Sequence, residues 1–389
     1  MEITALKNKL DSIYNDIESS KSISLLGGGP GIILFKLYYL KHIKQNDLAE
    51  IEADIQEFSE FSLNNNRYPS FCSGQAGLNW FFNFLFKQGY IEKGDYELIG
   101  STDFVLAKAS LEYLKRDCYD FLHGAVGIAH HLVYTKKRAL KPFLGELLDG
   151  IIKLMGKENP VLHHFDFDSY SLANRKINPS LSHGMTSVLK LCLECYQNKI
   201  YKRKSKFIAK NILNFLLSNV NSDHSYSYFP YVYDSDNNEN QQSRLSWCYG
   251  DLTIAYVMRQ YGILFEDQTV EKKAMEILYH SSMRRKDESG IVDAGFCHGT
   301  AGVAYIFNKL WHSTKDTVFQ DASQYWLQKT IDYPFHQDGL AGYKKYDHLS
   351  KEWVNDSGLL EGVAGIGLTI ISCLFQDYSW DYCLMLNDC

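Results

Sequence analysis

Two short segments bring together side chains that suit metal binding. The first reads WCYG from Trp247 and the second reads FCHG from Phe296, so that a cysteine stands two residues before a glycine in both. The two thiols of Cys248 and Cys297 and the imidazole of His298 form a donor set that suits zinc. Three protein ligands would leave a fourth position open, as in catalytic zinc sites. The alternative is packing, because free cysteine is often buried in a core.

The glycine of these segments belongs to a pattern that occurs seven times along the chain. A bulky or small apolar residue stands two positions before G-x-x-G or a close variant, and an apolar run follows. Successive copies are 46 to 66 residues apart, which is enough for two helices and their loops. Adjacent repeats that both carry a cysteine at this position favour the metal site over packing. The first glycines are Gly28, Gly74, Gly124, Gly184, Gly250, Gly299 and Gly362.

These repeats predict a fold of paired helices. Each glycine precedes an apolar stretch that we expect to form a buried helix, and amphipathic stretches such as 269–282 and 321–333 predict half-exposed partners. Stacked pairs form either an open solenoid or a closed ring, and seven equivalent glycines favour an all-α, (α/α) toroid with inner and outer helices. No Pro/Ser-rich linker interrupts the sequence, so we predict a single domain over 1–389. The polar stretch 234–244 and the strand-like stretch 225–233 are placed in the connection between the fourth and fifth repeats.

Three other clusters of cysteine or histidine receive simpler interpretations. Cys192 and Cys195 lie in the apolar run of the fourth repeat and are predicted to pack in the core. The segment from His163 to Asp168 is predicted to be a polar loop, because its spacing corresponds to no metal geometry. The pair that begins at His130 is expected to be partly exposed on the helix of the third repeat.

Composition excludes several classes of protein. The 40 basic and 46 acidic residues give a net charge of −6, which leaves no basic excess for nucleic acid. Nine cysteines in 389 residues are an odd number in a long chain, unlike a small disulfide framework. The first 22 residues lack the apolar core of a secretory signal, and the apolar run 358–375 contains Glu361 and four glycines, which favours a buried helix over a membrane span. We therefore expect a cytoplasmic protein without a transmembrane segment.

The chain resembles the lanthionine synthetase cyclase family, the stand-alone cyclases of lantibiotic-type peptide biosynthesis. The resemblance runs from Leu25 to Leu368 and is sharpest in RLSWCYG from Arg244 and in CHG from Cys297. It implies an (α/α) toroid with seven inner helices and one zinc ion per chain. The zinc ligands that it implies are Cys248, Cys297 and His298, and the other active-site residues are Asp120, His183 and Arg244.

Two departures from the family pattern lie near this site. The fourth repeat reads HGMTS from His183, where the family usually keeps a second glycine, and the fifth reads CYGDLT from Cys248, where the family usually has Pro-Gly after the first glycine. Both change the mouth of the ring and bear on substrate shape more than on the metal.

The reaction that the resemblance implies is addition of a peptide cysteine thiol to dehydroalanine or dehydrobutyrine, which forms a thioether ring. A free thiol with a pKa of about 8.5 is mostly protonated at neutral pH, and zinc would favour the thiolate. His183 would protonate the resulting enolate, Asp120 would accept a proton or orient a base, and Arg244 would hold a carboxylate or stabilise enolate charge. His123 is a further candidate for the lining of the site. The implied partners are a dehydrated precursor peptide and a separate dehydratase, in the cytoplasm or in a membrane-associated biosynthetic complex.

Three alternative functions stay open at this point. A eukaryote-type relative joins glutathione to dehydroamino acids instead of closing peptide rings. A prenyltransferase-like or terpene-cyclase-like α/α barrel also forms a ring, but with six hairpins, and the nearest acid-rich motif here, 117–120, is weak. A non-enzymatic binding protein on the same ring would be favoured if the site held no metal.

Overall fold

The computed structural model describes residues 3–45, 49–63, 68–156, 162–166, 171–173, 176–221, 226–234 and 242–388. Two compact units are present, and each is built from several segments of the sequence. Unit 1 contains Met1–Asn66, Leu245–Trp247 and Ser282–Tyr382. Unit 2 contains Arg67–Arg244, Cys248–Ser281 and Cys383–Cys389. The units interleave along the sequence and are not consecutive domains, and a single cooperative domain over 1–389 stays a prediction.

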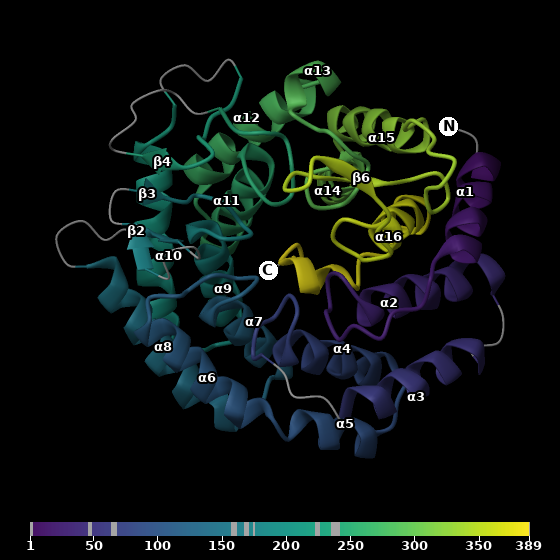
Figure 1. Cartoon of the computed structure of the whole chain (residues 1–389). Coiled ribbons are helices and arrows are strands. Elements are labelled where there is room, and N and C mark those ends of the chain that lie inside the picture. Colours follow the sequence, from purple (N-terminus) through teal and green to yellow (C-terminus); the bar gives the residue numbers. More distant parts are fainter. Residues whose placement is uncertain are drawn as a thin grey trace. The chain divides into compact units, whose positions relative to one another are not determined.

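Unit 1 has an inner row of helices and an outer row. Helices α14, α16 and α2 are neighbours, while α15 packs on α14, and α1 and α3 pack on α16 and α2 (Figure 1). Strands β5 and β6 form an antiparallel hairpin in which Tyr346 lies opposite Trp353. The elements are α1 (Ile3–Asp16), α2 (Gly29–Tyr39), a π-helical turn (Leu40–Lys44), α3 (Ala49–Leu63), α13 (Lys286–Ser289), α14 (Thr300–Thr314), α15 (Thr317–Ile331), β5 (Lys345–Asp347), β6 (Glu352–Val354) and α16 (Val363–Phe375).

Unit 2 repeats the same two-row arrangement. Helices α4, α7, α9 and α11 are successive neighbours, and α6, α8 and α10 form the row that packs against them (Figure 1). Two short antiparallel strand pairs are present. Strands β1 and β2 pair with each other before α9, and β3, also before α9, pairs with β4, which follows α10. The elements are α4 (Gln75–Gln88), α5 (Lys93–Gly100), α6 (Asp103–Lys115), α7 (Ala125–Thr135), a 3-10 turn (Arg138–Leu140), α8 (Lys141–Met155), β1 (His164–Asp166), β2 (Ser171–Ala173), β3 (Lys176–Ile177), α9 (Met185–Gln197), α10 (Lys202–Ser218), β4 (Tyr233–Asp234), α11 (Asp251–Phe265) and α12 (Gln268–Met283), with a 3-10 turn at Asp381–Leu384 between the last segments of the two units.

All seven predicted glycines stand at the beginning of an inner helix. Each is the residue immediately before α2, α4, α7, α9, α11, α14 or α16. These helices are buried on nearly all sides, as their continuous apolar sequences predict. Outer helices such as α8 and α10 bury only one stripe of residues. The division into buried and half-exposed helices is therefore as the sequence predicts.

Glycine is required in the motif for two physical reasons. Gly250 has a φ of +91°, a backbone conformation that residues with a Cβ rarely adopt. At Gly302, the second glycine of the sixth repeat, an added Cβ would lie 1.9 Å from the carbonyl oxygen of Phe296. The turn before the helix and its first helical turn thus pack backbone against backbone, and an alanine at Gly302 would force them apart.

The turns before the inner helices are joined by backbone hydrogen bonds between successive repeats. In unit 1, Trp247 N–H donates to Cys297 O at 3.0 Å, and Cys297 N–H donates to Leu360 O at 2.7 Å. In unit 2, Ser182 N–H donates to Cys248 O at 3.3 Å. Equivalent residues of adjacent repeats therefore lie side by side, so residues far apart in sequence meet just before the glycines.

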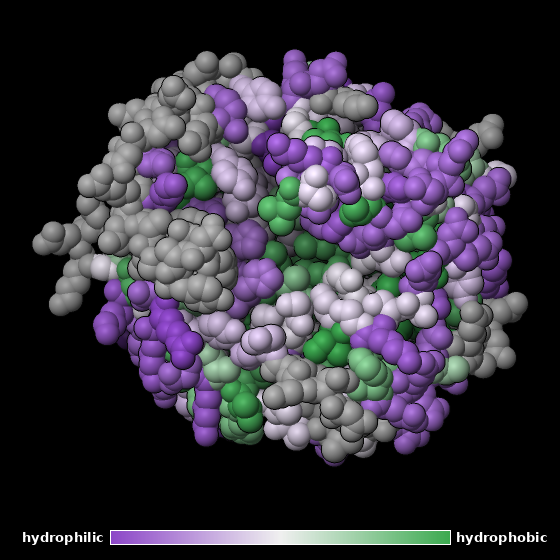
Figure 2. All heavy atoms as spheres, in the orientation of Figure 1, coloured by the Kyte–Doolittle hydropathy of each residue, from purple (hydrophilic) through white to green (hydrophobic). Residues whose placement is uncertain are grey.

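The surface shown in Figure 2 is covered mainly by hydrophilic side chains, with apolar side chains scattered among them. Fully buried side chains such as Trp80, Trp247, Trp326 and Trp380 fill the interiors of the two units. Within the described part of the chain, no helix is both long and apolar enough to cross a membrane.

Candidate metal centre

Cys297 and His298 occupy the turn that precedes α14 in unit 1. The backbone N–H and carbonyl of Cys297 are both hydrogen-bonded, to Leu360 and Trp247 respectively, so its position is fixed from two sides. Cys297 is 8% exposed, and the His298 side chain is 12% exposed. Both side chains are thus held in a nearly dry setting by the hydrogen-bonded turns.

Cys248 occupies the equivalent turn before α11. Its carbonyl accepts hydrogen bonds from both the backbone N–H and the hydroxyl of Ser182, the latter at 3.1 Å. One peptide bond joins Cys248 to Trp247, whose N–H is bonded to Cys297. This connection brings the second cysteine to the first.

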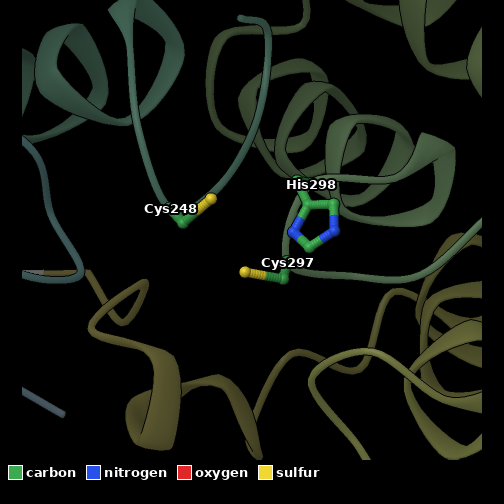
Figure 3. Close-up of side chains that lie close together, drawn as sticks. All are labelled: Cys248, Cys297 and His298. Atoms are coloured by element: carbon green, nitrogen blue, oxygen red, sulfur yellow. The ribbon is translucent and has the colours of Figure 1, made fainter. Parts of the chain in front are cut away.

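One ligand atom from each of Cys248, Cys297 and His298 lies within 4.8 Å of the other two. Figure 3 shows the three side chains turned toward one another. Two thiols and an imidazole are soft donors. Zinc binds such donors well, whereas magnesium and calcium prefer oxygen ligands. The donor set therefore fits a zinc ion, and the three residues are those predicted from the sequence.

His183 and Asp120 form a close pair in unit 2. The imidazole Nδ1 of His183 lies 2.6 Å from Oδ2 of Asp120, and the other oxygen, Oδ1, accepts the backbone N–H of His123 at 2.7 Å. The Asp120 side chain is 1% exposed and that of His183 is 25% exposed. Burial by itself lowers the pKa of His183, but the charge and hydrogen bond of Asp120 outweigh it and raise the pKa above its ordinary value. The Asp120 carboxylate therefore favours the protonated form of the His183 imidazole.

An aromatic side chain, Tyr249, lies near this imidazole. The rings of His183 and Tyr249 have centroids 6.1 Å apart, and Tyr249 stacks on Tyr231 at 4.1 Å. The amide of Asn178 donates to the Tyr249 hydroxyl at 3.4 Å. Tyr231 and Asn178 were not predicted as site residues: Asn178 stands six residues before Gly184, and Tyr231 lies in the strand-like stretch 225–233. Tyr249 lies within the WCYG segment, and no role was predicted for it.

Arg244 and His123 are the other two residues near the predicted site. Arg244 is half-buried, and its carbonyl lies against Gly250, where an added Cβ would be 2.3 Å from that oxygen. His123 lies parallel to His183 with centroids 6.1 Å apart. Burial lowers the pKa of His123, so its neutral form is favoured. A role for either residue stays a prediction.

The two departures from the family pattern have distinct structural consequences. Ser187, which replaces a glycine, turns its hydroxyl back to the carbonyl of Gly184 at 2.8 Å. Asp251 is fully buried, and its two carboxylate oxygens accept the backbone N–H groups of Tyr228 and Phe229 at 2.8 and 2.9 Å. Asp251, which lies directly before the departure at Leu252 and Thr253, therefore anchors the segment that carries Tyr231.

Two of the three competing clusters are buried in the core. Cys192 and Cys195 are buried as predicted, and burial raises the pKa of both thiols. The prediction that His130 and His131 are partly exposed is wrong. Both are fully buried, because His130 pairs with Glu194 at 2.8 Å and His131 pairs with Asp103 at 2.9 Å. In the third cluster, His163 is half-buried, His164–Asp166 form strand β1 where a polar loop was predicted, and Asp168 lies outside the described residues.

A family model described as "Lanthionine synthetase C-like protein" matches residues 19–385, nearly the whole sequence. The chain belongs to this family. Residues Cys248, Cys297 and His298 all lie within the matched range. No curated protein matches the sequence of this lanthionine synthetase C-like chain at a significant level.

Among solved structures, this lanthionine synthetase C-like chain is similar to one titled "Nisin cyclase". The identity is 17%, the match covers 98% of both chains, and the TM-score is 0.76. The likeness confirms the predicted fold class, an all-α, (α/α) toroid of helical hairpins. A sugar epimerase from a ruminal bacterium (12% identity, 78% of this chain and 86% of that chain) and a possible member of the GH105 family from Salmonella enterica (10%, 95% and 92%) have TM-scores of 0.46 and 0.48.

Proposed function

We propose that this protein is a zinc-dependent cyclase that closes thioether rings in a dehydrated precursor peptide. A cysteine thiol of the peptide would add to a dehydroalanine or dehydrobutyrine of the same chain. The sulfur would bond to Cβ and a proton would be delivered to Cα, so the product is an isomer of the substrate. The observation that carries the proposal is the group of Cys248, Cys297 and His298 with ligand atoms within 4.8 Å, in a chain of the lanthionine synthetase C-like family.

The three ligands would hold one zinc ion per chain. A bound zinc ion supplies Lewis acidity, which favours the thiolate form of a substrate cysteine at neutral pH. Two cysteine ligands give the site negative charge, which would preserve the nucleophilic character of a third sulfur.

His183 would supply the proton that the reaction requires at Cα. The carboxylate of Asp120 accepts a hydrogen bond from the Nδ1–H of His183 and raises the pKa of the imidazole, so Nε2 carries a proton in a larger share of molecules. The ring of Tyr249 lies near this imidazole and stacks on Tyr231, and we assign both tyrosines to contact with the substrate backbone or side chains. Arg244 would hold a carboxylate or stabilise enolate charge.

The substrate and partners follow from this chemistry. A separate dehydratase would have to produce the dehydroamino acids, and a reducing compartment such as the cytoplasm would keep the peptide thiols free. The peptide that is modified would contain cysteines together with dehydrated serines or threonines.

The ligand assignment is tested with matched cysteine variants. Cys72 occupies the same motif position in the second repeat, two residues before Gly74, but is not in the ligand group. We expect wild-type protein and Cys72→Ala to hold about one zinc ion per chain and Cys297→Ala to lose most of it, by elemental analysis. Equal zinc content in Cys297→Ala and Cys72→Ala would contradict the assignment.

The reaction is tested with a dehydrated, cysteine-containing precursor peptide. We expect alkylatable thiols to disappear while the peptide mass stays the same. His183→Asn should keep zinc and helicity but lose about 10²–10⁴-fold in the rate of ring closure, the usual contribution of a general acid. Addition of glutathione to the peptide, without cyclisation, would contradict ring closure and favour the glutathione-adding alternative.

A further inference from the structure

Asp293 lies beside the candidate ligand His298 and is used by no step described above. Its side chain is 3% exposed, and Oδ2 lies 3.6 Å from Nε2 of His298. The other oxygen, Oδ1, accepts the N–H of Gly295 at 3.1 Å, and the backbone carbonyl accepts the N–H of Thr300 at 3.1 Å. The N–H of Tyr346, in strand β5, also approaches Oδ2 at 3.4 Å. The carboxylate is therefore held in one orientation, with one oxygen turned to the imidazole.

The equivalent residues of two other repeats show which contacts of Asp293 belong to the turn itself. Asn178 and Asp356 stand six residues before Gly184 and Gly362, as Asp293 stands before Gly299. Their Oδ1 atoms accept the N–H two residues later, at 2.9 and 2.7 Å. Their backbone carbonyls accept the first helical N–H, at 2.9 and 3.0 Å.

An amide therefore serves this turn as well as a carboxylate does. Asn178 makes the turn with no negative charge, so the turn alone does not explain a buried aspartate at position 293. What distinguishes Asp293 is its second oxygen, which faces the imidazole of His298. Burial of an unpaired carboxylate costs folding free energy. Buried carboxylates therefore occur where they are paired with another group or accept hydrogen bonds.

A neutral imidazole has one nitrogen that carries a proton and one that carries a lone pair. A metal ion needs the lone pair, and the partner of the other nitrogen decides which tautomer is present. Because Nε2 of His298 faces Asp293, Nδ1 is the nitrogen left for a metal. Figure 3 shows one ring nitrogen of His298 on the side of the cysteine sulfurs and the other turned away from them.

We propose that Asp293 is a positioning residue that accepts the Nε2 proton of His298 and thereby directs the Nδ1 lone pair to the zinc ion. A small rotation of the imidazole would shorten the 3.6 Å separation to a hydrogen bond. The inference rests on the proposed function, because it presupposes that zinc binds at this site. It predicts an effect on zinc affinity that can be measured without any assay of cyclisation.

The first experiment compares Asp293→Asn with Asp356→Asn. Both substitutions keep the turn that Asn178 makes naturally, but only the first removes the carboxylate that faces His298. We expect zinc affinity, measured by competition with a chromogenic chelator, to fall about 10–100-fold in Asp293→Asn and to stay at the wild-type value in Asp356→Asn. Wild-type affinity in Asp293→Asn would overturn the inference while leaving the proposed function intact. Absence of zinc binding in the wild-type protein would overturn both.

A second measurement needs no variant and so does not depend on how Asp293→Asn folds. Long-range ¹H–¹⁵N NMR of the zinc-loaded wild-type protein reports which nitrogen of His298 carries the proton. We expect a protonated Nε2 and a metal-bound Nδ1. The reverse arrangement would overturn the inference, because Asp293 would then face a nitrogen with no proton to donate.

Discussion

Asp120 acts on His183 with one carboxylate oxygen while the other holds the backbone of His123. Asp120→Asn keeps an acceptor for the His123 N–H but removes the negative charge. Because that charge raises the pKa of His183, we expect the pKa to fall in the variant. Titration of the His183 ring protons by NMR measures the change, with His123→Ala as a control that leaves Asp120 ionised. A pKa of His183 that is unchanged in Asp120→Asn would contradict the pairing.

Asp103 is a second single residue that provides a test, here of how the free energy of unfolding depends on pH. Burial by itself raises its pKa, but hydrogen bonds from His131, Lys137 and Asn79 lower it from 3.8 to about 2. The ionised form is thus favoured by folding, and its contribution is complete above pH 3.8 and is lost as the pH falls toward 2. One pKa unit corresponds to about 1.4 kcal/mol, so the contribution is about 2 kcal/mol.

The comparison variant is Asp103→Asn, examined by urea unfolding between pH 2 and pH 7. We expect it to be less stable than the wild-type protein at pH 7, with a difference that narrows as the pH falls below about 4. A difference that stays constant over this range would show that the Asp103 charge does not contribute in this way.

At the scale of elements, Asp251 connects helix α11 to the segment 226–234. Its carboxylate accepts two buried backbone N–H groups of that segment, at Tyr228 and Phe229. Asp251→Ala would leave both groups without an acceptor, which costs about 1–3 kcal/mol for each. We expect a lower urea midpoint and faster cleavage near Tyr231 by chymotrypsin. Asp251→Asn, which keeps one acceptor oxygen, should have an intermediate effect, and wild-type cleavage in Asp251→Ala would contradict the anchor.

At the scale of the whole molecule, the chain passes between the two units five times, after residues 66, 244, 247, 281 and 382. Neither unit is a continuous stretch of sequence, so unfolding of one would pull on segments of the other. We therefore expect a single cooperative transition in calorimetry, with equal calorimetric and van't Hoff enthalpies. Two separate transitions would contradict the single-domain prediction.

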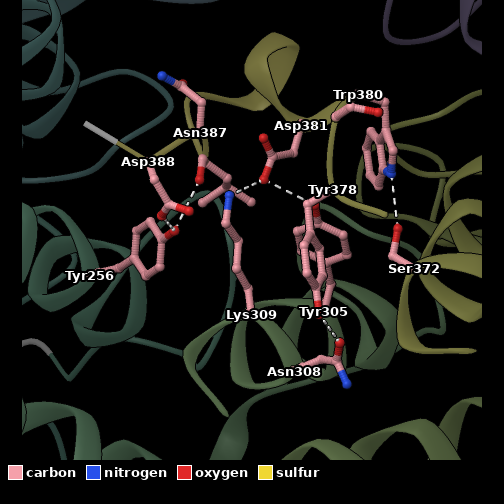
Figure 4. A network of polar contacts seen from close by, with 12 residues as sticks. Tyr256, Tyr305, Asn308, Lys309, Ser372, Tyr378, Trp380, Asp381, Asn387 and Asp388 are labelled. Carbon is pink, nitrogen blue, oxygen red and sulfur yellow. Dashed lines mark hydrogen bonds and ion pairs between the residues drawn. The ribbon is translucent and has the colours of Figure 1, made fainter. Parts of the chain in front are cut away.

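Buried lysines in each unit test this cooperativity. Lys309 pairs with Asp381 in unit 1 (Figure 4). In unit 2, Lys190 lies 3.8 Å from Glu194 and donates to Gln260 and to the carbonyl of Asn387. Removal of one partner of a buried charged pair costs about 3–5 kcal/mol. We expect Lys309→Ala and Lys190→Ala each to lower the midpoint of the same transition. The exposed pair of Lys273 provides the control, because Lys273→Ala should cost less than about 1 kcal/mol.

The repeat, the helices and the candidate ligands could be predicted from the residues alone. A motif glycine is dictated locally, because a positive φ at Gly250 and the close backbone approach at Gly302 exclude other residues. An apolar run after each glycine predicts a buried helix for the same local reason. The repeat then placed Cys248 and Cys297 at equivalent positions, and the family resemblance supplied the rest of the site.

Which buried polar groups lie close together depends on how the helices and turns pack. Glu194 lies 64 residues from its partner His130, and Asp103 lies 28 residues from His131, so no local pattern could show that both histidines are buried. Asp293 has the same turn signature as Asn178, and only the packing of the turn shows that its second oxygen faces His298. Helix propensity and glycine geometry depend on a few neighbouring residues, whereas a buried pair depends on how two elements pack, which the chain fixes only when it is folded.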